Sequence, residues 1–183
     1  MAGREFTEAF DRQYARLHLR SRSLISKTSP ESLYRKVGSA TAPAVYSMGE
    51  NLLRSAATVE QTFGGITANL WDDPFEWTLP ENLATTERVI EYLEEVEATR
   101  VRAFARFSLD SDLLKEVQVP PGTLRPLIHL LAETLVKAAD YQGRAVATLA
   151  LLFGDVAASP SDGTADADSN EVQRVKQVAQ FDE

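Results

Sequence analysis

The side chains best suited to bind a metal or transfer protons are His18, His129 and the adjacent acidic pairs Asp72–Asp73 and Glu94–Glu95. The two histidines are far apart in the chain, and neither belongs to a Glu-x-x-His motif of the kind found in di-iron bundles. The chain has no cysteine, so thiolate metal sites and cysteine nucleophiles are excluded. No nucleophilic triad or Gly-rich phosphate loop is visible. We therefore interpret the acidic pairs as solvated charges.

Charge is concentrated at one end of the chain. Residues 155–183 hold seven acidic residues against two basic ones and so contribute −5 to the net charge of −8, which leaves −3 for the rest. A nearly neutral body with an acidic tail argues against general binding of nucleic acid. One basic stretch without acids is interpreted as a solvated helical face. Its cations are Arg12, Arg16, Arg20, Arg22 and Lys27.

The sequence also indicates where the protein works. No apolar run is long enough to cross a membrane, and the N-terminal residues lack the apolar core of a secretory signal. Together with the absence of cysteine, this favours a cytoplasmic protein with no membrane partner.

Apolar residues recur at spacings of three and four along four stretches, which predicts four amphipathic helices. These helices cover residues 5–26, 48–69, 86–107 and 124–153. Ser47 and Glu50 form a predicted capping box before the second helix. Gly64 and Gly65 interrupt that helix, as a kink, a close helix contact or an early end. No strand pattern is present, and a tight turn is expected at residues 120–122.

The last helix is expected to organise the fold, because it is the longest apolar stretch. Its buried face includes Leu124, and Pro126 fits its first turn. Gly154 is a plausible residue to end it. Gly143 lies well inside and costs about 1 kcal/mol relative to Ala. We interpret this glycine as a point of close approach by another helix.

These elements predict an all-α protein built as a four-helix bundle over residues 1–154. Residues 155–183 are expected to be a flexible acidic tail, because their composition is small, polar and charged. Within the tail, residues 171–180 could form a short amphipathic helix that docks on the body or on a partner.

Four stretches resemble the DinB/YfiT-like superfamily of metalloenzymes. They are SMGENLLRSAATVE, WTLPENLATTERVIEYLEEVEATR, VQVPPGT and ADYQGRAVATLALLFG, and with the first helix they span roughly residues 5–154. The resemblance implies a bundle with an up-down-down-up arrangement, often dimeric. It also implies a divalent metal held by three histidines, one on the second helix and two on the last.

The residues at these three family positions are Arg54, Lys137 and Tyr141, so all three expected histidines are absent. Lys and Arg are cations near neutral pH and offer no lone pair to a metal. We therefore expect no metal and no other cofactor. The former metal pocket, lined by Arg54, Lys137 and Tyr141 and covered by Trp77, is expected to bind the carboxylate or phosphate of a small anionic ligand.

Three alternatives remain open from the sequence. Glu50 and Glu133 each lie four residues before a cation, Arg54 and Lys137, so the cations could form local salt bridges instead. A metal-dependent or metal-independent transferase or hydrolase is a second alternative, with Tyr141 as an acid–base residue. The third is a nonenzymatic interaction module, a homodimer formed through the helix that carries Gly143.

Overall fold

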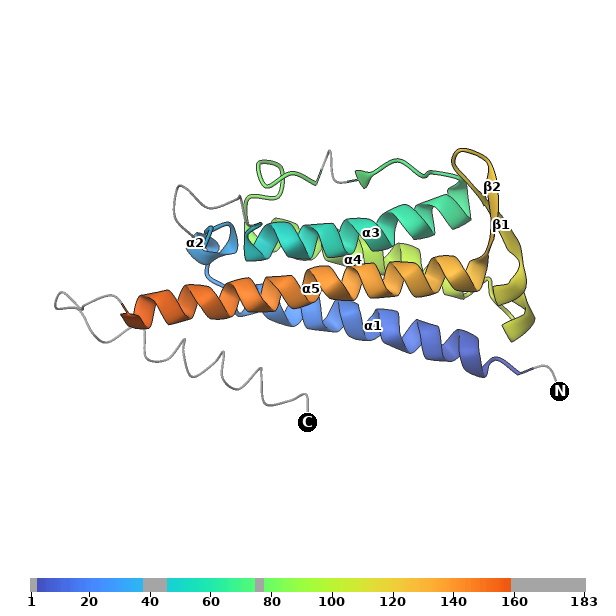
Figure 1. Cartoon of the computed structure of the whole chain (residues 1–183), viewed down its shortest axis with the longest axis horizontal. Coiled ribbons are helices and arrows are strands. Elements are labelled where there is room, and N and C mark those ends of the chain that lie inside the picture. The colour runs from blue at the N-terminus through green and yellow to red at the C-terminus, as the bar shows by residue number, and fades with distance from the viewer. Residues whose placement is uncertain (1–2, 38–45, 75–77, 159–183) are drawn as a thin grey trace.

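The computed structural model describes residues 3–37, 46–74 and 78–158. Four long helices dominate this part of the chain, as predicted (Figure 1). They are α1 (Glu5–Ser26), α3 (Met48–Ala68), α4 (Thr86–Phe104) and α5 (Leu127–Ala158). The shorter elements are helix α2 (Pro30–Leu33), the 3₁₀ helix η2 (Asp110–Leu114) and strands β1 (Glu116–Val119) and β2 (Thr123–Pro126). The prediction of a predominantly helical protein is confirmed.

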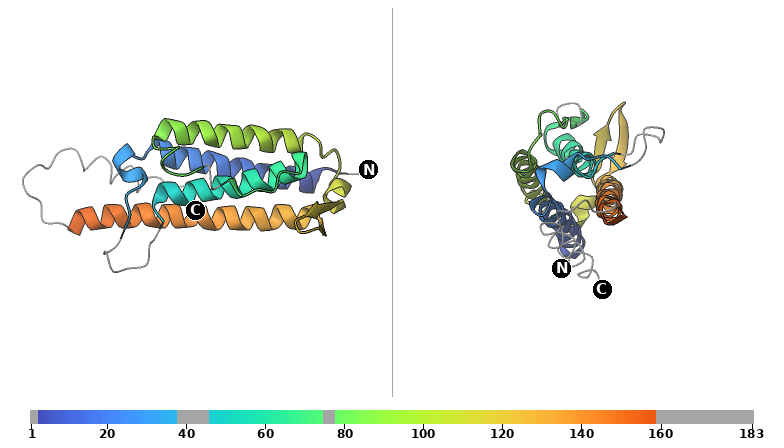
Figure 2. Two further views of the ribbon diagram at one scale, coloured as in Figure 1. Left: turned by 90° about the horizontal axis from the view of Figure 1, so that it is seen from above. Right: turned by 90° about the vertical axis from the view of Figure 1, so that its left-hand side faces the viewer.

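The long helices lie side by side around one core (Figure 2). Helix α3 packs most extensively against α5 and also contacts α4, while α1 packs against α4 and α5. Helices α1 and α5 run in one direction, and α3 and α4 run in the other (Figure 1). The hairpin of β1 and β2 closes the end of the molecule where α3 and α4 end and α5 begins.

The start of α3 follows from local chemistry. Ser47 Oγ accepts from the Glu50 backbone N–H at 3.2 Å, and the Glu50 carboxylate accepts from the Ser47 N–H at 2.7 Å. These bonds satisfy two backbone donors that a helix start otherwise leaves unpaired. The predicted capping box is confirmed. The helix ends at Asn69, whose left-handed φ of 57° is a conformation that asparagine tolerates well.

The prediction of a chain without strands is wrong at residues 116–126. Strands β1 and β2 pair antiparallel, with Val119 opposite Thr123 across the predicted turn. Gly122 takes a φ of 119° in this turn, which explains why glycine stands there. Each strand has only four residues, so the alternation of apolar and polar residues was too short to be recognised.

The hairpin also changes the limits predicted for the last helix. Leu124 belongs to β2 and is 57% exposed, not part of a buried helical face. Pro126 ends β2, and α5 begins at the next residue. Gly154 lies inside α5, which runs to Ala158, so it does not end the helix. A single glycine costs a helix about 1 kcal/mol, which is too little to end a long one by itself.

The two glycine positions that were predicted to matter behave differently. A Cβ on Gly65 would lie 2.4 Å from the Trp71 ring, so this glycine makes room for an indole that packs directly on α3. A Cβ on Gly143 would meet nothing within 4 Å in the described part of the chain, so the predicted close contact with another helix is not found among these residues. The close approach occurs on α3, and the partner is a side chain from the following loop.

The centre of the core is aromatic. Tyr14 meets the Phe63 ring edge-to-face with centroids 5.1 Å apart, and Phe63 lies 5.5 Å from Phe104. Not every apolar residue of the long helices is covered. Phe6 is 67% exposed and Val101 is 49% exposed, because helical spacing does not show how wide the covered face is. None of the described helices combines the length and apolar character that a membrane span requires.

Candidate functional site

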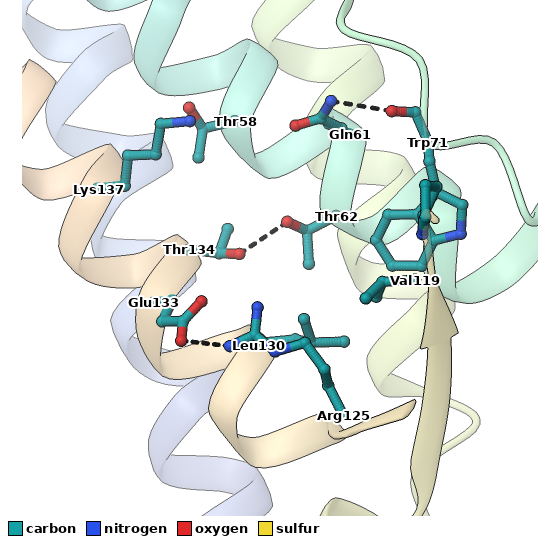
Figure 3. A pocket seen from close by; sticks show the side chains of 11 residues that line it. Thr58, Gln61, Thr62, Trp71, Val119, Arg125, Leu130, Glu133, Thr134 and Lys137 are labelled. Atoms are coloured by element: carbon teal, nitrogen blue, oxygen red, sulfur yellow. Dashed lines mark hydrogen bonds and ion pairs between the residues drawn. The ribbon is translucent and has the colours of Figure 1, made fainter. Parts of the chain in front are cut away.

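A cavity of about 380 Å³ opens between α3, α5, the hairpin and the loop after α3 (Figure 3). Its size lies within the range of small-molecule sites. It is lined by Thr58, Gln61, Thr62, Trp71, Val119, Pro120, Arg125, Leu130, Glu133, Thr134 and Lys137. One wall is therefore a row of polar α3 side chains, and the others combine charged and apolar groups.

Lys137 is the predicted site residue that the structure brings to this cavity. It extends from α5 toward α3, on the side of Thr58 (Figure 3). Its predicted local partner, Glu133, instead forms an ion pair with Arg125 of β2. That bond is the main reason why the pKa of Glu133 is lowered. Within the described residues, no carboxylate forms an ion pair with Lys137, which is exposed and lines the cavity.

The other predicted site residues lie elsewhere or outside the described chain. The Arg54 guanidinium stacks 4.0 Å above the Tyr46 ring, and Glu50 is engaged with the Ser47 N–H and with Lys36 at 4.0 Å. The half-buried ring of Tyr141 lies 5.5 Å from the Arg144 guanidinium. Neither Arg54 nor Tyr141 lines this cavity. Trp77, predicted to cover the pocket, lies outside the described residues.

An aromatic residue from the loop after α3 lines the cavity, namely Trp71. Its carbonyl accepts from Gln61 Nε2 at 2.9 Å, and its ring rests on the surface left open by Gly65. The indole N–H donates to Asn69 Oδ1 at 3.1 Å. The paired glycines beside an aromatic loop were the sequence signal for this contact, but they do not show which aromatic residue fills the space.

Three threonines form the buried floor of the cavity and were not identified from the sequence. Thr58 and Thr62 lie one turn apart on α3, and Thr134 faces them from α5. All are at least nine-tenths buried. The hydroxyls of Thr62 and Thr134 are 2.7 Å apart. Threonines repeated at a spacing of four on the apolar side of a helix were the available signal.

The histidines do not form a metal centre in the described part of the chain. His18 Nε2 lies 3.7 Å from Glu94, and His129 is exposed on α5. Among the described residues, no group of three histidines or carboxylates is arranged to hold a metal ion. That the protein binds no metal remains a prediction.

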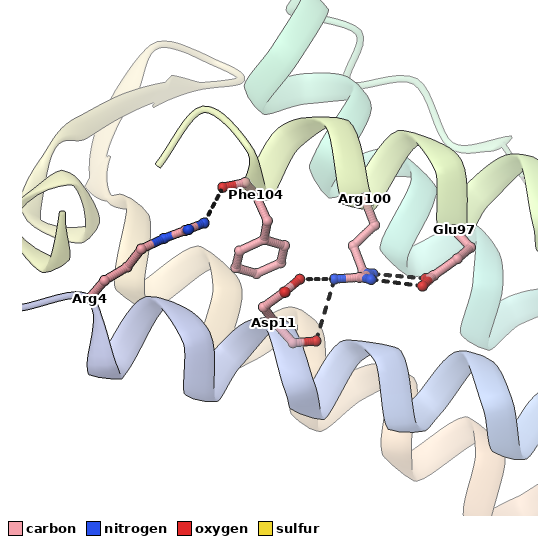
Figure 4. Close-up of polar contacts among 5 residues, drawn as sticks. All are labelled: Arg4, Asp11, Glu97, Arg100 and Phe104. Atoms are coloured by element: carbon pink, nitrogen blue, oxygen red, sulfur yellow. Dashed lines mark hydrogen bonds and ion pairs between the residues drawn. The ribbon is translucent and has the colours of Figure 1, made fainter. Parts of the chain in front are cut away.

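A second cation, Arg100, lies in the seam between α1 and α4 (Figure 4). Although it is a charged residue, only 4% of it is exposed. Its guanidinium donates to Glu97 and to Asp11 and packs 5.6 Å from the Phe104 ring centroid. Burial by itself lowers the pKa of Arg100, but these two carboxylates more than reverse that effect and raise it.

Comparison with known proteins leaves this site to be interpreted from its own geometry, because no family model, curated protein or solved structure matches the chain.

Proposed function

We propose that the cavity between α3, α5 and the hairpin binds a small anionic ligand through Lys137. One observation carries this proposal. Lys137 is a cation beside a 380 Å³ cavity, and no carboxylate among the described residues forms an ion pair with it. A carboxylate or phosphate is the group that such a charge binds most readily.

The surroundings of Lys137 support binding. Arg125 and Glu133 neutralise one another at the rim, so the cavity keeps one net positive charge from these three residues. Trp71 and Leu130 add apolar surface against which the rest of a ligand can pack. Such a combination of apolar walls with a few polar groups is typical of small-molecule sites.

We further propose that the chain is a DinB-like bundle with an up-down-down-up arrangement whose metal site has been lost. The directions of the four long helices agree with this arrangement (Figure 1). Lys137 occupies one of the family's ligand positions and lines the cavity, which supports reuse of the former metal region for an anion. Reaction chemistry is not needed to explain these groups.

The test is calorimetric titration of the full chain with acetate, hexanoate and inorganic phosphate. We expect at least one anion to bind, and Lys137→Met to weaken that binding about tenfold or more, since a charge-assisted hydrogen bond is lost. The matched control is Lys27→Met, which removes the same charge at the C-terminal end of α1, the end of the molecule away from the hairpin. Binding that is absent, or equal in both variants, would contradict the proposal.

A second candidate function is homodimer formation through the outer face of α5, which the exposed Gly143 favours. The position that a Cβ would take is open. Val136 lies two turns earlier on the same side with 71% exposure, and Leu151 lies about two turns later, roughly 80° around the helix, with 57%. We expect light scattering after size exclusion to give the dimer mass, and Gly143→Glu to give the monomer. A weak dimer should form at a concentration of about 100 µM. A natural chain that is still monomeric at this concentration would exclude homodimer formation.

A further inference from the structure

The proton positions on the cavity floor indicate what else the ligand carries besides its anionic group. Thr58 Oγ1 donates its proton to the Arg54 carbonyl oxygen at 2.8 Å, a bond that helical threonines commonly make. Its oxygen keeps a lone pair, and Thr58 lines the cavity. In this arrangement, Thr58 can accept a hydrogen bond from a ligand but has no proton to donate.

The neighbouring hydroxyls of Thr62 and Thr134 lie 2.7 Å apart and share a hydrogen bond in which either can be the donor. Each oxygen keeps a lone pair beyond that bond, so Thr62 can also accept a hydrogen bond from a ligand. Thr58 is the hydroxyl of the floor whose proton is committed to the backbone.

A floor of buried acceptors selects a ligand that brings donors, because a buried acceptor left without a partner is costly. The donors are expected to be neutral. An ammonium group on the ligand would be repelled by Lys137, and Glu133, the only carboxylate among the described residues that lines this cavity, is already bound to Arg125. Asp72 lines an adjoining hollow but not this cavity. Hydroxyl groups fit these requirements best.

We propose that the ligand is an anion joined to a hydroxyl-bearing chain or ring, as in a sugar acid or a sugar phosphate. This inference rests on the proposed binding of an anion by Lys137. The anionic group pairs with Lys137, hydroxyls donate to Thr58 and Thr62, and C–H groups pack against Trp71. The hydroxyls thus decide which anions are bound.

The test compares six-carbon carboxylates that differ only in their donors, with calorimetry on the full chain. Gluconate carries hydroxyls, hexanoate carries none, and 6-aminohexanoate carries an ammonium group. We expect gluconate to bind about tenfold more tightly than hexanoate, as one additional satisfied buried acceptor predicts. Glucose 6-phosphate and hexyl phosphate form the matched pair for a phosphate ligand, and the tighter of the two hydroxylated probes identifies the anionic group.

Two variants at Thr58 assign the effect. Thr58→Val removes the acceptor while keeping the shape, so it should abolish the tenfold preference for the hydroxylated probe and leave binding of the apolar probe unchanged. Thr58→Ser keeps the acceptor and should keep the preference, even if the valine variant folds poorly. The control is Thr99→Val on α4, where the threonine makes the same bond to the carbonyl four residues earlier, at 3.1 Å.

The outcomes separate the two proposals. Equal or tighter binding of hexanoate and hexyl phosphate would overturn the inference of a hydroxylated ligand and leave the anion site standing. Tightest binding of 6-aminohexanoate would overturn it in favour of an amine. A preference that survives Thr58→Val, or that is lost in a folded Thr58→Ser variant, would overturn the role of this hydroxyl. If none of the carboxylate probes and none of the phosphate probes binds, both proposals fail.

Discussion

Arg100 and Lys137 are two cations in the same bundle with opposite surroundings. Arg100 lies in the seam of α1 and α4, where Glu97 and Asp11 accept its hydrogen bonds (Figure 4). Lys137 stands at a cavity between α3 and α5, and no carboxylate in the described part of the chain forms an ion pair with it (Figure 3). A positive charge thus links α1 to α4 at Arg100, whereas at Lys137 it is available to a ligand.

The comparison separates stability from binding. A buried cation with both partners present is costly to disturb, because each carboxylate left behind becomes an unpaired, partly buried charge. A cation that lines a cavity makes few interactions with the rest of the protein. Its removal should therefore change ligand binding more than folding stability. Substitutions in the two regions should therefore affect different measurements.

The largest expected effect on folding is that of Arg100→Met. The loss of the bonds to Glu97 and Asp11 should lower the free energy of unfolding by about 3 kcal/mol. Urea denaturation followed by circular dichroism measures this change. Arg102→Met, which removes an exposed arginine of the same helix, should change stability by less than about 0.5 kcal/mol. Equal effects of the two variants would contradict a structural role for Arg100.

The next effect is that of Gly65→Ala at the cavity wall. The added methyl group would lie 2.4 Å from Trp71, so the indole or the helix must move. We expect a loss of about 1–3 kcal/mol from overpacking. Because Trp71 lines the cavity, its fluorescence emission should shift as well. An unchanged spectrum together with unchanged stability would mean that the indole does not pack on α3.

The opposite sign is expected for Gly143→Ala, the matched change on α5. The methyl group enters open space, so only helix propensity changes. The free energy of unfolding should rise by about 0.5–1 kcal/mol. Thermal denaturation of the monomer measures this gain. A loss of stability would show that another segment closely approaches this face.

The smallest expected effect on folding is that of Lys137→Met. Because no ion pair among the described residues is lost, the free energy of unfolding should change by less than about 0.5 kcal/mol. The same variant should lose anion binding in the calorimetric titration. A loss of stability similar to that of Arg100→Met would mean that Lys137 has a structural partner and is not a binding residue.

Local signals predicted most of the helices but little of the site. The capping box of Ser47 and Glu50 and the spacing of apolar residues act within a few positions, so they can be read directly. The hairpin was missed because its strands have four residues each. The polar floor was missed because Thr58 and Thr134 resemble ordinary helical threonines until α3 and α5 are brought together.

The sequence by itself determined the helical nature of the chain, the limits of α1, the start of α3 and the turn at Gly122, because each depends on neighbours within one or two turns. Only the tertiary structure decided that Arg100 is paired with carboxylates and that Lys137, within the described residues, is not. Asp11, on another helix, pairs with Arg100. Arg125, on a neighbouring strand, pairs with Glu133, which therefore does not pair with Lys137. Pairing between charges depends on distances in space, and spacing along a helix predicts it only where no closer partner arrives.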